Sequence, residues 1–313
     1  MIDPNQCCTQ CEDYLSRFLG GRVNFVRAEL LPKSTRDAPW RLDIEVNGVL
    51  QSFVLRLETR NLDHEYQVLR AMASIPIPTA GVYGWDSEGE AFGVPCFFSD
   101  YIEGESLLKP MLTGEAWAEE LYLDTVSALQ GITQEDLGKV IPKLTCETAA
   151  DVLEDAQAYF RNNPRPLAAR AYRVLKETMP VLPTVRFSNG DLWLDNFLVR
   201  DQQLVGVIDF ENAGFSDPIF EFLLSFFVSP ELQGRGIEER YCQRMGYDPA
   251  TLQWYHGLEY FDTLRWVLST NEPFVHHTVE SLEANLRRWL DDTEIHNSRQ
   301  TGPTAIKREI TAI

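Results

Sequence analysis

The sequence lacks a long hydrophobic run, and its first residues, MIDPNQCC, are polar. A helix needs about 20 mainly apolar residues to span a bilayer, and a secretory signal needs an apolar segment near the N-terminus. We therefore expect neither a membrane span nor a signal peptide, and we expect a cytoplasmic location.

Basic residues are also scarce. Lys and Arg number 28 against 47 Asp and Glu, which gives a formal net charge of −19. Binding to a nucleic-acid backbone depends on a basic surface, so the balance argues against a nucleic-acid partner. It favours a cationic small molecule through long-range attraction, although acidic residues equally serve solubility.

Cysteines are few and do not form a metal-binding pattern. Of the six, Cys7, Cys8 and Cys11 form the only cluster, and no second Cys or His pair follows at a zinc-finger spacing. We expect packing or free thiols, and no disulfides in a reducing compartment. A chain of 313 residues exceeds the usual size of one hydrophobic core, so we expect two packed units that share a cleft.

The stretch 187–218 carries the densest chemistry in the chain. Two short β-rich runs, 197–199 and 205–208, flank a polar turn at 201–203 and predict a hairpin. At its mouth we expect Asp191, Asn196 and Asp209 to converge. Asp and Asn oxygens suit Mg²⁺, which proteins usually hold with one or two carboxylates plus substrate phosphates. The third group, the Asp191 carboxylate, would then be left to take a proton, as in phosphoryl transfer.

Within this stretch, NGDLWLDNFLV followed by GVIDFENAGFSDP resembles the signature of the aminoglycoside phosphotransferase and choline kinase family, HGDxxxxNxL and then IDxxxAxxGDP. The resemblance implies that Asp191 orients and deprotonates an acceptor hydroxyl. It also implies that Asn196 and Asp209 hold Mg²⁺, with ATP or GTP as co-substrate.

One position departs from that signature, because Asn189 stands where the family usually has His. We interpret Asn189 as a structural support of the catalytic loop, since an amide keeps both a donor and an acceptor. Asp217 resembles the family aspartate that ties this loop to the next helix. It could equally cap that helix, with Pro218 at the first helical position.

The first hundred residues predict five strands and one helix. The strands are expected at 23–31, 40–46, 49–57, 81–85 and 92–101, with the helix at 62–72. This is the order of a kinase N-terminal lobe. We predict an α+β, two-lobed, protein-kinase-like fold with a small five-stranded antiparallel N-lobe and a larger, mainly helical C-lobe. The predicted boundaries are 1–101 for the nucleotide-binding lobe and 102–296 for the catalytic and acceptor-binding lobe, with a hinge at 99–104 and a tail at 297–313.

The resemblance also assigns nucleotide contacts. Arg56 on the third strand takes the place of the phosphate-binding lysine of kinases, and Glu65 on the helix takes the place of its ion-pair partner. Ser99, Asp100 and Ile102 would line the adenine site, with the backbone of the last two reading the base edge. The alternatives are an exposed strand arginine with a solvated glutamate, and a plain strand end before a turn.

Where kinases carry a glycine-rich loop, this chain has LLPKSTRDAPW, without glycine. Glycine lets backbone amides approach phosphates closely. We expect Lys33, Ser34, Thr35 and Arg36 to supply donors and charge there instead, or the loop to act as a flexible lid.

The remainder predicts helices at 115–130, 149–161, 166–177, 218–227, 231–245, 249–269 and 278–291. The resemblance places the acceptor pocket on the last three of these helices, between residues 231 and 291. Candidate lining residues, which could equally pack the core, are Tyr241, Trp254, Tyr255, His256, Glu259, Asp262 and Trp266.

Together these features predict a Mg²⁺-dependent kinase that phosphorylates a small-molecule hydroxyl on an aminoglycoside-like, amino-alcohol or sugar acceptor. A non-catalytic, kinase-like nucleotide-binding or regulatory protein is the main alternative, favoured by the glycine-free loop and Asn189. A kinase acting on protein side chains is a further alternative. Only GFS separates Ala213 from Asp217, which leaves little chain to dock a peptide. The sequence does not indicate the oligomeric state.

Overall fold

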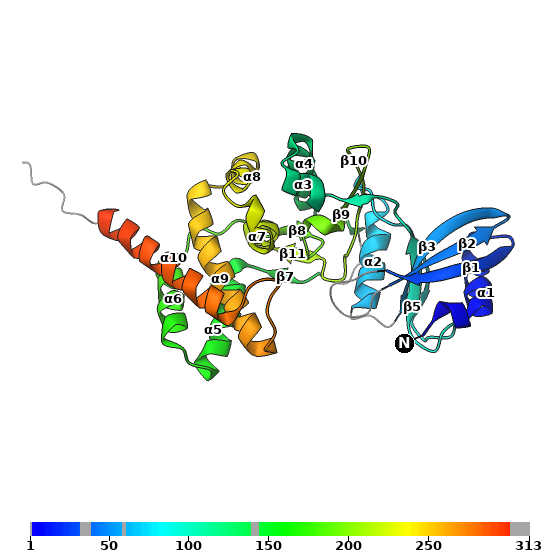
Figure 1. The fold of residues 1–313 in the computed structure, drawn as a ribbon, viewed down its shortest axis with the longest axis horizontal. Coiled ribbons are helices and arrows are strands. Elements are labelled where there is room, and N and C mark those ends of the chain that lie inside the picture. The colour runs from blue at the N-terminus through cyan, green and yellow to red at the C-terminus, as the bar shows by residue number, and fades with distance from the viewer. Residues whose placement is uncertain (1, 32–38, 58–60, 139–143, 301–313) are drawn as a thin grey trace, which may run out of the picture. The chain divides into compact units, whose positions relative to one another are not determined.

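The computed structural model describes residues 2–31, 39–57, 61–138 and 144–300 (Figure 1). The chain forms two compact units, Met1–Thr148 with Pro183–Tyr247, and Ala149–Leu182 with Asp248–Ile313. The lobe boundary predicted near residue 101 therefore falls inside the first unit. The hinge and the stretch 187–218 belong to the same unit as the N-terminal sheet.

The first unit contains a five-stranded antiparallel sheet of order β1-β2-β3-β5-β4. Its strands are β1 (Val23–Leu30), β2 (Trp40–Val46), β3 (Val49–Leu57), β4 (Val82–Asp86) and β5 (Cys96–Asp100). The β2–β3 turn has positive φ at both Asn47 and Gly48, as expected of an Asn-Gly hairpin. Strand β5 starts later than predicted, because Gly89 and Gly93 adopt positive φ in a loop before it.

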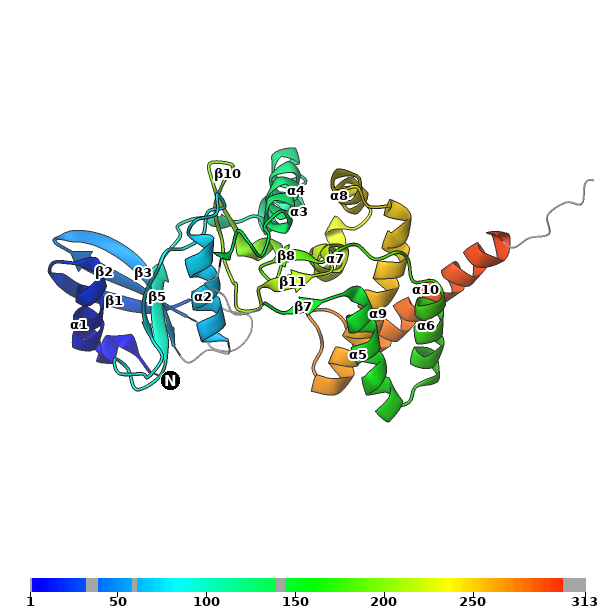
Figure 2. The ribbon, with the colours of Figure 1, turned by 180° about the vertical axis from the view of Figure 1, so that it is seen from behind.

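Helices cover opposite faces of this sheet. Helix α1 (Cys8–Leu19) follows the short 3₁₀ turn η1 (Pro4–Gln6), and α2 (Leu62–Met72) follows β3. Neighbouring β5 residues show the two faces, since Phe98 packs against Tyr14 of α1 and Phe97 packs against Tyr66 of α2. Figures 1 and 2 show the sheet between these helices.

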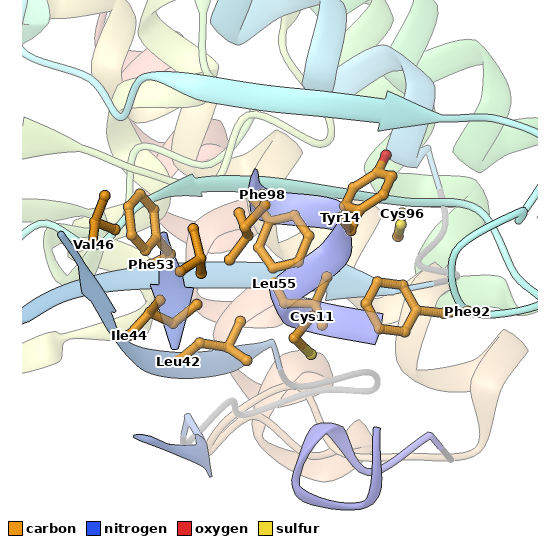
Figure 3. Packing of buried hydrophobic residues seen from close by; sticks show 12 residues of the cluster. Cys11, Tyr14, Leu42, Ile44, Val46, Phe53, Leu55, Phe92, Cys96 and Phe98 are labelled. Atoms are coloured by element: carbon orange, nitrogen blue, oxygen red, sulfur yellow. The ribbon is translucent and has the colours of Figure 1, made fainter. Parts of the chain in front are cut away.

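The core of this sheet lies on the α1 side (Figure 3). Alternating side chains of β2 and β3 point into it, among them Leu42, Ile44, Phe53 and Leu55. Cys11 also lies there, and burial raises the pKa of its thiol to about 12. Cys11 therefore packs in the hydrophobic core rather than binding a metal.

The outer edge of β1 is covered by polar side chains from the N-terminal segment. The Asn5 amide donates to the Ala28 carbonyl at 3.1 Å and accepts from its N–H at 2.9 Å. The Glu12 carboxylate accepts from the Phe25 N–H at 2.7 Å. Side chains thus occupy ladder positions that a further strand would otherwise use.

The rest of the first unit holds two small sheets, of order β10-β9-β6 and β7-β11-β8. Their strands are β6 (Glu105–Ser106), β7 (Cys146–Glu147), β8 (Arg186–Ser188), β9 (Phe197–Arg200), β10 (Gln203–Val207) and β11 (Gly214–Ser216). The hairpin turn is shorter than predicted, because Asp201 and Gln202 alone form it, both at positive φ.

Helices of this unit are α3 (Leu108–Thr113), α4 (Ala116–Gln130), α7 (Pro218–Val228) and α8 (Ile237–Met245). The single helix predicted from Glu231 is wrong in its first turn and a half. A 3₁₀ turn, η4 (Pro230–Leu232), is followed by Gly234 and Gly236 at positive φ, which separate it from α8.

The second unit is helical, with α5 (Ala149–Asn162), α6 (Pro166–Glu177), the 3₁₀ turn η5 (Pro249–Thr251), α9 (Leu252–Thr270) and α10 (Val279–Gln300). Helix α10 extends past its predicted end at Asp291, into the predicted tail. Throughout the described ranges, no helix combines the length and apolar character needed to cross a bilayer.

Candidate active site

The loop after β8 is shaped by one glycine. Gly190 has φ +80°, and a Cβ at this position would lie 2.2 Å from the Asn212 carbonyl oxygen. Only glycine allows both the left-handed backbone and this close approach. The loop that carries Asp191 therefore packs directly against the segment that follows Asp209.

Asn189 connects the same two segments. Its Nδ2 lies 2.8 Å from the Asp191 carbonyl oxygen and 3.2 Å from the carbonyl oxygens of both Ile208 and Asp209. The side chain is fully buried. An amide in place of the family histidine thus supplies donors to three backbone carbonyls, a geometry suited to bracing the loop.

Asp191 presents a partly buried carboxylate beside Asp209. Burial, followed by repulsion from the Asp209 carboxylate, raises the Asp191 pKa to about 6. Hydrogen bonds from the Asn196 side chain and the Trp193 backbone N–H act in the opposite direction. The three residues predicted to converge do lie together, and Asp191 is ionised at neutral pH while holding a pKa suitable for a general base.

The donor set at this point fits a hard divalent cation. Asn196 Nδ2 donates to the Asp191 carbonyl oxygen at 2.9 Å, which commits its nitrogen and leaves its amide oxygen as the ligating atom. The Asp209 carboxylate, from a residue at φ +61°, would supply the second oxygen. Within the described residues, no group of three or more His, Cys, Asp or Glu side chains could hold a metal ion. An ion held by Asn196 and Asp209 would complete its shell with phosphate oxygens and water.

A cavity next to Asp209 collects the predicted nucleotide-binding residues. Its polar lining is formed by Arg56, Glu65, Ser99, Asp100 and Asp209. Its apolar lining includes Val54, Leu69, Ala80, Ile102, Leu198, Val207 and Ile208. The cavity thus combines apolar walls with a charged part formed by Arg56, Glu65 and Asp209, a combination that suits a purine base and its phosphates.

The charged part of the cavity contains an ion pair. Arg56 Nη2 lies 3.0 Å from Glu65 Oε1, and the two side chains are 12 % and 1 % exposed. Arg56 projects from β3 and Glu65 from the first turn of α2. Glu65 therefore orients the guanidinium, whose flat array of donors matches phosphate oxygens.

Residues 99–102 of the hinge line the cavity, and side-chain contacts hold the hinge in place. The Asp100 carboxylate accepts from the Gly81 N–H at 3.0 Å and from the Tyr83 hydroxyl at 2.8 Å. Ile102 packs against Gly206 of β10, where an added Cβ would lie 2.4 Å from Ile102 Cδ1. Ser99 is 5 % exposed and lines the cavity from β5.

Asp217 begins helix α7. Its carboxylate accepts from the Ile219 N–H at 3.0 Å and the Phe220 N–H at 3.1 Å, with Pro218 in the first turn. Its own backbone N–H donates to the Glu147 carbonyl. Asp217 therefore caps this helix, and its predicted role in supporting the catalytic loop stays a prediction.

The four strongest candidates for the acceptor pocket all lie on α9, in the second unit. Trp254 and Tyr255 are buried, and Trp254 Nε1 donates to the Leu175 carbonyl oxygen at 2.8 Å. Glu259 is 4 % exposed, and Asp262 pairs with Arg265 at 2.8 Å. The two aromatic residues thus contribute to the core of this unit, and the assignment of all four to acceptor binding stays a prediction.

Sequence reasoning missed a buried carboxylate behind the catalytic loop. Gly190 N–H donates to Ser188 Oγ at 3.0 Å, and Ser188 Oγ donates to Glu221 Oε2 at 3.2 Å. Burial raises the Glu221 pKa to about 7. A signal was present, since Glu221 is the only charged residue in the helix PIFEFLLSFFV. Residues 33–36 of the glycine-free loop lie outside the described residues.

The Phosphotransferase enzyme family matches residues 40–255, and the chain belongs to this family. Solved structures of aminoglycoside phosphotransferases share its fold. One, described as a candidate aminoglycoside phosphotransferase from Ralstonia eutropha JMP134, has 15 % identity and a TM-score of 0.67, covering 93 % of this chain and 98 % of that one.

Two further structures carry bound ligands. A thermostable mutant of APH(4)-Ia in a ternary complex with ADP and hygromycin B has 16 % identity and a TM-score of 0.60, covering 94 % of this chain and 99 % of that one. APH(2")-IIIa with GDP and kanamycin has 18 % identity and a TM-score of 0.61, covering 91 % and 98 %. No curated protein sequence matches the chain. The predicted family and fold class are confirmed, and the chain is a phosphotransferase with a kinase-type fold.

Proposed function

We propose that this protein is a Mg²⁺-dependent small-molecule kinase that transfers the γ-phosphate of ATP or GTP to a hydroxyl group. One observation carries the proposal. A single cavity brings together the Arg56–Glu65 pair, the hinge and Asp209, and the carboxylate of Asp191 stands next to Asp209.

The residues divide the work of phosphoryl transfer. Asp191 accepts a hydrogen bond from the acceptor hydroxyl and takes its proton as the oxygen attacks. Arg56, oriented by Glu65, binds the phosphates that are not transferred. Asn196 and Asp209 would hold Mg²⁺, which when bound neutralises charge that builds on the phosphate oxygens. Asn189 and Gly190 fix the distance between the base and the metal ligands.

The acceptor class is proposed from charge and from the neighbours. The chain has a net charge of −19, which attracts polycations. Structures of similar fold are complexes with hygromycin B and with kanamycin. Amine-bearing sugars and amino alcohols are therefore the first acceptors to test. The cytoplasmic location and the non-catalytic alternative stay predictions.

Nucleotide binding is tested first, by thermal-shift titration with ATP and GTP, each with and without Mg²⁺. We expect a metal-dependent rise in melting temperature, and an Asp209→Ala variant should lose the metal-dependent part. Phosphorylation is then followed by ADP or GDP release with a panel of aminoglycosides, amino alcohols and sugars.

The matched control for chemistry is Asp191→Asn. It should bind Mg²⁺-nucleotide as the wild type does while losing at least about a thousandfold in turnover, since both the base and its charge are removed. Metal-dependent binding without transfer to any acceptor would favour the non-catalytic alternative. No nucleotide binding at all would overturn the proposal.

A further inference from the structure

The residue before Glu65 makes a contact that the proposed chemistry does not use. His64 Nε2 lies 2.8 Å from the Ala213 carbonyl oxygen. A carbonyl oxygen only accepts, so Nε2 carries the proton and donates. The contact joins the first turn of α2 to a segment 149 residues further along the chain.

The segment that receives this hydrogen bond is the turn after Asp209. Ala213 is 1 % exposed, and its N–H donates to the Phe210 carbonyl oxygen at 3.1 Å, which closes the turn. Asp209 itself has φ +61°, a left-handed conformation that is uncommon for non-glycine residues, although aspartate adopts it more readily than most. The Asp209 side chain is therefore aimed by contacts made to the residues on either side of it.

Two contacts hold this turn from different directions. Asn189 donates to the Ile208 and Asp209 carbonyl oxygens, on the side of the catalytic loop. His64 donates to the Ala213 carbonyl oxygen, on the side of α2. Adjacent residues of a helix point about 100° apart, so α2 can direct Glu65 toward Arg56 and His64 toward this turn at once.

We propose that His64 is a positioning residue that ties helix α2 to the Asp209 turn. This contact keeps the Arg56–Glu65 pair and the Asp209 carboxylate at fixed positions relative to each other. The proposal rests on the proposed function for its consequence in catalysis. The hydrogen bond from His64 to Ala213 itself does not depend on bound metal or nucleotide. It makes metal-dependent nucleotide binding sensitive to a residue that touches neither metal nor nucleotide.

The test compares His64→Ala and His64→Gln with the wild type. Glutamine retains an N–H donor near the same position, whereas alanine removes it. Asp63→Ala is the matched control, because Asp63 is the neighbouring residue of the same helix turn and is exposed. Circular dichroism and melting temperature without ligand establish that each variant folds.

The first readout is amide hydrogen exchange in the protein without ligand. His64→Ala should speed exchange in segment 210–216 by roughly five- to tenfold, the loss expected for one hydrogen bond of ordinary strength. His64→Gln should recover part of the protection, and Asp63→Ala should leave it unchanged. Equal exchange in His64→Ala and the wild type would overturn the tie.

The second readout is the Mg²⁺ concentration that gives half-maximal ADP binding. It should rise roughly five- to tenfold in His64→Ala, with partial recovery in His64→Gln and none of the effect in Asp63→Ala. An unchanged Mg²⁺ requirement would overturn the coupling to the metal ligand. A wild type that binds no nucleotide would instead count against the proposed function, and the exchange measurement would still decide the tie.

Discussion

Arg56 and Glu65 form a buried ion pair between β3 and α2, with Nη2 of the arginine 3.0 Å from Oε1 of the glutamate. The glutamate side chain is 1 % exposed. Burying either charge without a partner costs on the order of several kcal/mol of desolvation free energy, and the opposite charge of the other residue offsets part of this cost. The pair thereby fixes α2 against the sheet beside the charged part of the cavity.

Removing both partners of this pair should be less damaging than the two single removals added together. We expect Glu65→Ala to lower the free energy of unfolding by about 3 kcal/mol, because Arg56 would remain buried without its counter-charge. The double variant Arg56→Ala, Glu65→Ala should lose less than the sum of the single variants. Urea unfolding of the four proteins in the cycle measures this. Additive losses would contradict the account.

The pH dependence of turnover should reflect the Asp191 carboxylate. Its pKa is raised to about 6 by burial and by Asp209, and the base must be ionised to accept a proton. We therefore expect kcat/KM to be flat above about pH 7 and to fall tenfold per pH unit below about pH 6. Bound Mg²⁺ offsets the repulsion from Asp209, so kcat should hold to lower pH. A flat profile down to pH 5, in a protein still folded there, would remove Asp191 as the base.

Glu221 should make the fold less stable as pH rises. Burial raises its pKa in the folded state to about 7, from an ordinary value of 4.5, so the folded protein binds the proton more tightly than the unfolded chain does. Stability from this group is present below the unfolded pKa and is lost as pH rises through about 7.

Substituting glutamine removes this proton binding and tests the assignment. Between pH 5 and pH 8, the stability of Glu221→Gln relative to the wild type should rise by on the order of 1–2 kcal/mol. Urea unfolding at the two pH values measures it, and Glu88→Gln, on an exposed turn, is the control. A difference that does not change with pH would show that Glu221 keeps an ordinary pKa.

Asn189 should matter through its donor. Asn189→Leu leaves three partly buried carbonyl oxygens without the Nδ2 donor and should destabilise the protein by about 1–3 kcal/mol, with a larger loss in turnover. Asn189→His, the residue usual in the family signature, keeps a ring N–H and should retain most of the activity. Melting temperature and steady-state rates separate the two effects. A fully active Asn189→Leu would argue against bracing.

Local sequence patterns were sufficient to predict much of the fold. Strands β2 and β3 and helices α2 and α6 have the predicted bounds, since alternation, turn residues and helix periodicity are local signals. The errors occur where glycines set the backbone, as before β5 and before α8. There the positive φ of each glycine decides where an element begins. The presence of a glycine in the sequence does not show whether its φ is positive.

The site divides in the same way. The spacing of Asp191, Asn196 and Asp209 predicted their convergence, because a short hairpin brings them together. The contact of His64 could not be assigned from sequence, and although Glu221 stands out as a lone charge in an apolar helix, its contact with Ser188 could not be assigned either. The partners lie far along the chain, and only the tertiary fold brings them into contact. For the same reason Trp254 and Tyr255, proposed for acceptor binding, turned out to be buried side chains of the second unit.

The polar cover on strand β1 has a consequence for how the protein behaves at high concentration. Asn5 occupies the N–H and carbonyl groups of Ala28, and Glu12 occupies the N–H of Phe25. A neighbouring molecule would need these groups in order to add a strand to the sheet. An uncovered edge is a template for intermolecular pairing and aggregation. The first dozen residues thus protect this edge of the sheet, and removing them should expose the edge and increase self-association of the protein.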